Sequence, residues 1–218
     1  MKKLIISVFA LGALLSSCTE SGKKAETTDA KEVEVVQTET TTEFKTIKDG
    51  SHLKWKAAHL GGVNERFGKV SLTEGQVSAT DGKVSNAKFV IDLGSLTVES
   101  IEEEEKAAKL AGHLKNEDFF NIEKFPTAQF ELTNTEAAEG DFNTKVTGNL
   151  TISGITKSIT FNANISVSEN EITVKSEDFV VDRKDWELTY HAEGTEGVAA
   201  DYLIADAIGF TIDIALTK

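Results

Sequence analysis

The chain has 218 residues and a formal net charge of −13, and it is 39% hydrophobic and 27% charged, which is the balance of a globular protein. Because binding to phosphate groups needs a patch of Lys and Arg, this acidic chain without a basic cluster argues against a nucleic-acid partner. The single cysteine excludes an internal disulfide and zinc sites built on several cysteines.

The N-terminus has the layout of a secretory signal. A positive start at residues 2–3 and an apolar run at residues 4–15 precede two small residues and then Cys18. Residues 15–18 (LSSC) also resemble the bacterial lipoprotein box, which implies cleavage before Cys18 and acylation of that residue. The alternative is an ordinary signal peptide followed by a chance cysteine. We expect a signal peptide at residues 1–17 and a stable lipid anchor at Cys18, since several acyl chains hold a protein on a membrane.

The neighbour of Cys18 bears on the destination of the protein. Thr19 does not resemble the Asp that marks inner-membrane retention in some bacteria. We therefore expect the protein to reside in the bacterial cell envelope. We favour anchoring to the outer membrane, with the domain facing the periplasm or the exterior, over anchoring to the inner membrane. Residues 18–42 are polar and lack aromatic residues, so they are predicted to form a flexible tether with a reach of roughly 25–30 Å. A short strand over residues 33–36 is the competing interpretation.

Residues 43–218 are predicted to fold as one domain made mainly of strands. Apolar and polar residues alternate over 158–167 and again over 208–216, and shorter alternations occur near 53–57, 87–93, 128–133 and 142–152. This period of two is typical of half-buried strands. Turn signals separate them at 81–82, 153–154 and 169–170. About eight antiparallel strands predict an all-β fold, either a closed barrel or a sandwich.

One stretch has helical rather than strand spacing. Ser100 and Glu103 have the spacing of a capping box, and apolar residues follow every three or four positions. We predict one helix over 102–115, then a loop or short helical turn over 116–126.

The sequence nominates no catalytic chemistry. The histidines, His52, His59, His113 and His191, form no close metal-ligand pair, and there is no nucleophile elbow, P-loop or dinucleotide fingerprint. We therefore expect no enzyme activity, no metal and no cofactor. What remains is an apolar interior with a high phenylalanine count of 12. Phe lacks a polar group, so an interior lined by it suits hydrocarbon, although inward Phe is also ordinary core.

Several motifs in order resemble the YceI-like polyisoprenoid-binding family. They are residues 113–120 (HLKNEDFF) with 125–130 (FPTAQF), residues 148–157 (GNLTISGITK), residues 179–186 (FVVDRKDW), and His59 with residues 67–68. One departure is Glu187, where the family pattern has Gly. The resemblance spans the whole predicted domain. It implies an eight-stranded antiparallel lipocalin-like β-barrel with one flanking helical segment, and a long isoprenoid lipid of the quinone or polyprenyl phosphate type bound in an apolar tunnel.

On that reading, inward side chains line the tunnel for storage, transport or sensing of the lipid. The predicted wall consists of Trp55, Phe89, Ile91, Phe130, Phe161, Ile165, Phe210 and Ile212. Phe119, Phe120 and Phe125 are predicted to form a gate or plug. His59, His113 and Arg183 either contact a polar headgroup or satisfy buried backbone groups.

Two other functions stay open at this point. One is a packed barrel that serves as a protein-interaction module, and the other is a lipid-modifying enzyme that uses acidic residues near the mouth. An apolar last strand also suggests a homodimer.

Overall fold

The computed structural model describes residues 22–33 and 41–218. The predicted signal peptide at residues 1–17 and the predicted lipidation site Cys18 lie outside them. Among the described residues, no helix is long and apolar enough to cross a membrane.

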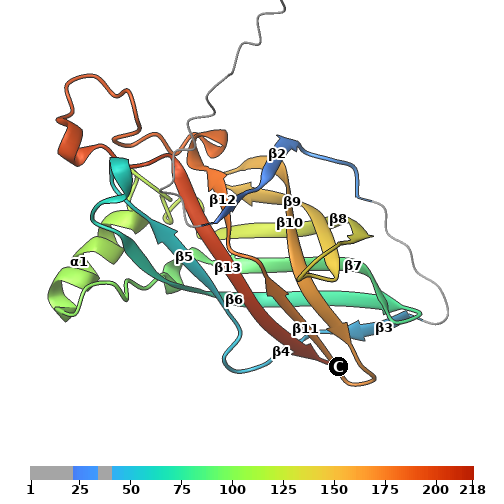
Figure 1. Cartoon of the computed structure of the whole chain (residues 1–218). Coiled ribbons are helices and arrows are strands. Elements are labelled where there is room, and N and C mark those ends of the chain that lie inside the picture. The colour runs from blue at the N-terminus through green and yellow to red at the C-terminus, as the bar shows by residue number, and fades with distance from the viewer. Residues whose placement is uncertain (1–21, 34–40) are drawn as a thin grey trace, which may run out of the picture.

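The domain is a closed antiparallel barrel with one helix (Figure 1). Its eight wall strands pair in the order β5, β6, β7, β8, β9, β10, β11, β13 and back to β5. Their bounds are β5 His52–Ala57, β6 Arg66–Thr80, β7 Lys83–Asp92, β8 Thr127–Ala137, β9 Thr144–Ile152, β10 Ile155–Val167, β11 Glu171–Ser176 and β13 Ala207–Thr217. The predicted eight-stranded barrel is confirmed.

Shorter elements complete the fold. The strands among them are β1 Lys23–Lys24, β2 Glu26–Asp29, β3 Thr41–Phe44, β4 Thr46–Ile47 and β12 Phe179–Asp182. The 3-10 turns are η1 Leu60–Gly62, η2 Leu93–Ser95, η3 Arg183–Trp186 and η4 Ala200–Tyr202, and the helix is α1 Glu104–Lys115. β13 pairs with β11 and β12 on one edge and with β4 and β5 on the other. Both edges of β13 are therefore paired within the chain over these residues. This pairing argues against a homodimer formed by pairing of the last strand with a second copy.

The hairpin turns follow from left-handed backbone positions. Asp81 and Gly82 join β6 to β7 with φ of 52° and 74°, and Ser153 and Gly154 join β9 to β10 with φ of 49° and 80°. Two successive positive φ values match the twist of the flanking strands, which is why Asp-Gly and Ser-Gly stand there.

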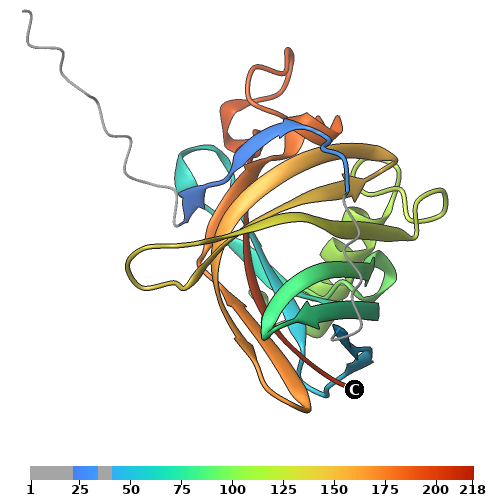
Figure 2. The same cartoon turned by 90° about the vertical axis from the view of Figure 1, so that its right-hand side faces the viewer.

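Part of the predicted tether belongs to the barrel. β1 runs parallel to β12, and β2 pairs antiparallel with the first half of β10 (Figure 2). Ala25 is 4% exposed within the main core, and its amide donates to the Val180 carbonyl at 2.8 Å. Residues 23–29 thus fill the seam, the gap in the sheet between β10 and β12. Over residues 22–33 the structure therefore differs from the predicted flexible tether.

The helix is shorter than predicted and lacks the capping box. α1 begins at Glu104, and its N-cap Glu103 makes no side-chain cap bond. The Ser100 hydroxyl is buried without a partner. The amides of Glu99 and Ser100 both donate to the Phe67 carbonyl of β6, so this segment is held against the barrel and cannot cap the helix. The apolar face of α1 packs on Trp55, Leu96 and Val98.

Candidate functional site: an apolar cavity in the barrel

A cavity of about 370 Å³ occupies the barrel interior beside α1. Its walls come from most barrel strands, from α1, and from the 187–206 segment that lies at the same end of the barrel (Figure 1). A second, smaller cavity of about 70 Å³ lies further along the interior. Every predicted wall residue lines one or both: Trp55 and Phe210 the large one, Phe89 and Ile165 the small one, and Ile91, Phe130, Phe161 and Ile212 both.

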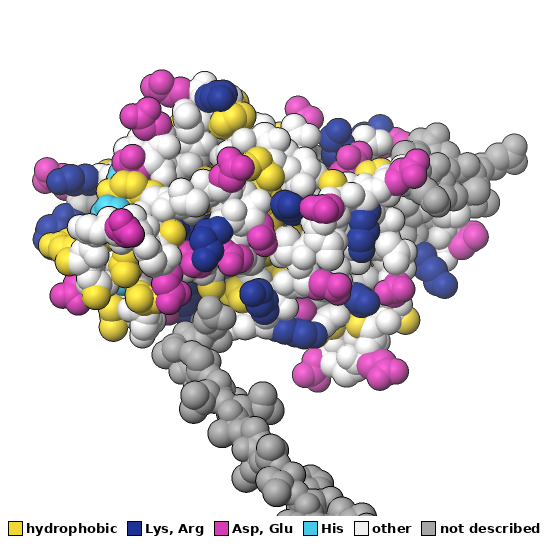
Figure 3. All heavy atoms as spheres, turned by 90° about the horizontal axis from the view of Figure 1, so that it is seen from above, with side chains coloured by type: hydrophobic (Ala, Val, Ile, Leu, Met, Phe, Trp, Pro, Cys, Tyr) yellow, Lys and Arg dark blue, Asp and Glu magenta, His cyan; other side chains and the backbone are white. Residues whose placement is uncertain are grey.

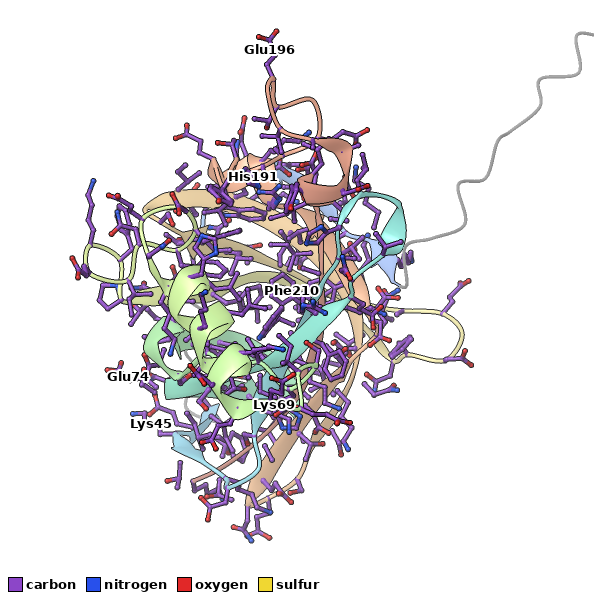
Figure 4. The ribbon with its side chains drawn as sticks, turned by 90° about the vertical axis from the view of Figure 1, so that its left-hand side faces the viewer. Lys45, Lys69, Glu74, His191, Glu196 and Phe210 are labelled. Carbon is purple, nitrogen blue, oxygen red and sulfur yellow. The ribbon has the colours of Figure 1, made fainter. Side chains whose placement is uncertain are left out.

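The strand register explains why these side chains converge. Phe210 lies opposite Trp55, and Ile212 lies opposite Leu53, on the neighbouring strands β13 and β5. Residues two apart on a strand share a face, so all four side chains point inward. In Figure 4, Phe210 lies inside the barrel behind α1.

A row of phenylalanine rings crosses the interior. The centroids of Phe130 and Phe161 are 6.0 Å apart, those of Phe161 and Phe179 are 4.6 Å apart with nearly parallel planes, and those of Phe179 and Phe210 are 6.0 Å apart. Phe179 also lines the large cavity. Sequence analysis placed Phe179 in a motif but did not assign it to the wall, although its position at the start of an apolar strand was a usable signal.

The cavity reaches the surface at an aromatic mouth. His113 of α1 lies edge-on to both Phe119 and Tyr190, with centroids 5.2 and 5.3 Å apart, and Tyr190 stacks on His191 at 4.0 Å. The His113 Nε2 atom is 3.1 Å from Asp118 Oδ2. The structure thus brings the predicted His113 and Phe119 together. Tyr190 and His191 were missed, because they lie in an irregular loop without periodicity.

The rim of the mouth is partly apolar. Tyr202, which is 64% exposed, lines the cavity, and Val63, also exposed, follows η1. His59 precedes η1 and contacts η4, with its Nδ1 2.7 Å from the Asp201 carbonyl oxygen. Seen from above, apolar side chains gather around a histidine at the left end of the molecule (Figure 3). In Figure 4, His191 lies at the base of the loop whose tip carries Glu196.

Arg183 is built into the backbone of the mouth. It is 2% exposed, and it donates to the backbone carbonyls of Leu188, Tyr190, Ile204 and Ala205 at 2.6–3.2 Å. Its guanidinium also lies 3.7 Å from the Asp206 carboxylate. Desolvation lowers the pKa of Arg183, while the charges of Asp206 and Asp182 act against that shift. This geometry satisfies buried backbone groups, one of the two roles expected for Arg183.

The predicted gate is divided. Phe119 and Phe120 line the large cavity. Phe125 lines neither cavity. Its ring packs beside Gly154, and the Lys124 ammonium lies 5.0 Å from its centroid. The prediction that Phe125 belongs to the gate is therefore not supported by its position, because the turn at 121–125 places its ring against Gly154, between β9 and β10.

Metal-ligating side chains do not gather at this site. Within residues 22–33 and 41–218, no group of three or more His, Cys, Asp or Glu side chains is arranged to hold a metal ion.

A family model for the YceI-like domain matches residues 44–216. The chain belongs to the YceI-like domain family. The matched residues lie within the range 43–218 that was predicted as the domain.

Relatives of this YceI-like domain are found in pseudomonads. A "UPF0312 protein" of Pseudomonas putida strain F1 is 32% identical over 123 residues, which are 56% of this chain and 60% of the relative. A "UPF0312 protein" of Pseudomonas aeruginosa strain LESB58 is 30% identical over 125 residues, 56% of this chain and 61% of the relative. The match therefore spans about three fifths of the length of these relatives.

Two solved structures share the fold of this YceI-like domain. Burkholderia cenocepacia BcnA aligns with a TM-score of 0.57 and 18% identity, covering 77% of this chain and 96% of BcnA. A polyisoprenoid binding domain from Saccharophagus degradans aligns with a TM-score of 0.57 and 14% identity, covering 81% of this chain and 99% of that domain. At these identities the likeness is one of fold.

Proposed function

We propose that this YceI-like domain binds one isoprenoid lipid, with the chain in the large cavity and the headgroup at the aromatic mouth. The observation that carries the proposal is the cavity of about 370 Å³ with phenylalanine and aliphatic walls. Burial of each CH₂ group contributes about 0.8 kcal/mol before the cost of ordering the chain is subtracted. The Saccharophagus degradans domain of the same fold is named for binding this class of ligand.

A neutral headgroup of the quinone type suits the mouth better than a phosphate. Phosphate binding relies on several charge-assisted donors. Arg183 already donates to four carbonyls, and no lysine lines the cavity among the described residues. Arg66 is the other arginine in the lining, and it donates to the Glu65 carbonyl at 3.1 Å. The rings of Phe119, Tyr190 and His191 offer flat surfaces on which a quinone ring can stack.

Native mass spectrometry tests this function. The chain from Thr19 onward is expressed in a bacterium, its mass is measured intact, and its lipids are extracted and identified. We expect a stoichiometric extra mass that resolves to an isoprenoid quinone. A clean apo mass, unchanged after incubation with quinones and with polyprenyl phosphates, would contradict the proposal, and binding of the phosphates alone would contradict the headgroup assignment.

A matched pair of variants locates the site. Phe210→Trp adds bulk inside the large cavity, and Phe125→Trp makes the same change outside both cavities. Overpacking costs typically 1–3 kcal/mol, so both variants are checked for folding first. We expect only Phe210→Trp to lose the bound lipid. Equal lipid occupancy in the two folded variants would argue against the large cavity as the site.

We also propose that Cys18 carries the membrane anchor and that the protein resides in the bacterial cell envelope. The support is the sequence of residues 15–18, with the single cysteine of the chain at the position that lipidation requires. Metabolic labelling with a tagged fatty acid tests it. We expect label on the native protein and none on Cys18→Ser, whereas equal label on both would exclude Cys18 as the acylated residue.

A further inference from the structure

The two interior cavities meet at a single ring of side chains. Leu53, Ile91, Phe130, Phe161 and Ile212 line both the large and the small cavity, and no other described residue does so. They come from five different strands, β5, β7, β8, β10 and β13, so they encircle the interior. We call these five side chains the girdle.

The two aromatic members of the girdle are held from behind. A Cβ placed on Gly148 of β9 would lie 2.2 Å from Cζ of Phe130, so the Phe130 ring rests directly on the backbone of Gly148. The Phe161 ring stacks on Phe179 with an interplanar angle of 6°. Neither ring can retreat into its own wall without displacing backbone or another ring, since protein interiors are closely packed.

Beyond the girdle the interior is nearly full. The small cavity holds only about 70 Å³, and its lining is entirely apolar. Phe44, Val77, Ile172 and Leu216, all at most 1% exposed, lie in the same core cluster. A chain that enters from the mouth therefore meets a floor of packed side chains at the girdle, with the small cavity beyond it.

We infer that the girdle, through Phe130 and Phe161, sets the longest isoprenoid chain that this domain accepts. The inference rests on the proposed function and adds a specificity to it. Chains short enough to end at the girdle bind in the large cavity. Longer chains must leave isoprene units in water or force the two rings aside, and both alternatives weaken binding.

A ladder of quinones that differ only in the number of isoprene units tests this inference. Binding of each quinone is measured by native mass spectrometry on the wild type, on Phe130→Ala, and on the milder Phe130→Leu. Phe125→Ala is the matched control outside both cavities. Truncation of Phe130 leaves space that neighbouring residues refill only partly, so the small cavity becomes continuous with the large one.

We expect the wild type to bind up to a sharp chain-length limit. Phe130→Ala should move that limit upward by about one isoprene unit, Phe130→Leu should move it less, and Phe125→Ala should leave it unchanged. A wild type without a limit, or one limit shared by all the folded variants, would overturn the role of the girdle while leaving the proposed function intact. If no quinone of the ladder binds the wild type, the proposed function itself fails, and the girdle inference with it.

Discussion

Trp55 and Phe210 lie directly opposite each other on β5 and β13, and both side chains line the large cavity. Trp186, the other tryptophan of the chain, is 1% exposed, lines neither cavity, and donates from Nε1 to the Leu150 carbonyl at 3.1 Å. The two indoles therefore report on different parts of the molecule.

This separation predicts the response of tryptophan fluorescence to a ligand. In Trp186→Phe, the remaining Trp55 should be quenched saturably by added quinone, because the ligand contacts its ring. In Trp55→Phe, the remaining Trp186 should respond far less. Fluorescence titration of both variants measures the effect, and responses of equal size would show that quinone does not bind beside Trp55.

Arg183 is expected to be a stability residue of the mouth. Arg183→Lys loses the planar donor set and leaves the buried carbonyls of Leu188, Tyr190, Ile204 and Ala205 without these partners. We expect a loss of about 3 kcal/mol in the free energy of unfolding. Urea unfolding measures it. Arg66→Lys, the same change at the rim, should stay within about 0.5 kcal/mol of the wild type, and equal losses in the two variants would contradict the assigned role.

Two glycines predict opposite effects of the same substitution. A Cβ on Gly68 of β6 would lie 1.9 Å from the Thr97 carbonyl oxygen, whereas a Cβ on Gly112 of α1 would meet nothing within 4 Å. Gly68→Ala should push the 96–101 segment off the barrel and destabilise the protein by about 2 kcal/mol or more. Gly112→Ala should stabilise it by about 0.5–1 kcal/mol, because Ala is the better helix former. The melting temperatures of both variants, measured by thermal unfolding, test this prediction. Shifts of the same sign in the two variants would contradict it.

A charge introduced into residues 23–29, which pair with β10 and β12, should loosen this segment locally without unfolding the whole barrel. Ala25 is buried and Ala30 is exposed, so Ala25→Asp places a charge in the core and Ala30→Asp does not. We expect Ala25→Asp to release residues 23–29 from β10 and β12 while the barrel stays folded. Limited digestion with a lysine-specific protease should then cut at Lys23, Lys24 and Lys31 much faster than in the wild type or in Ala30→Asp. Equal cleavage of the two variants would show that burial of Ala25 does not hold the segment.

The barrel could be predicted because each wall strand buries one face, which leaves a period of two in the sequence. The same property identified the wall residues, since Phe130, Phe161 and Phe210 had to face inward. The mouth could not be predicted in the same way, because Tyr190 and His191 lie in a loop held by the backbone contacts of Arg183. Glu187, where the family pattern has Gly, has φ of 58°. Gly adopts this left-handed conformation without the steric cost that Glu meets, which explains the family preference for Gly here.

Residues 23–29 could not be recognised as strands for a different reason. Their sequence, KKAETTD, carries one apolar residue, Ala25, so composition favours a solvated coil. The pairing is made by backbone groups that β10 and β12 leave free at the seam. Asn149 extends this attachment with two side-chain bonds to the backbone of Lys31 at 2.9 and 2.7 Å.

The attachment of that segment also limits how the domain can stand on a membrane. Four residues lead from Cys18 to Gly22, and Gly22 already lies against Val180 on the barrel wall. Fully extended, four residues reach about 14 Å. With the proposed anchor at Cys18, the barrel would therefore sit beside the lipid headgroups with restricted orientation, and a cargo lipid would have only a short path between the bilayer and the domain.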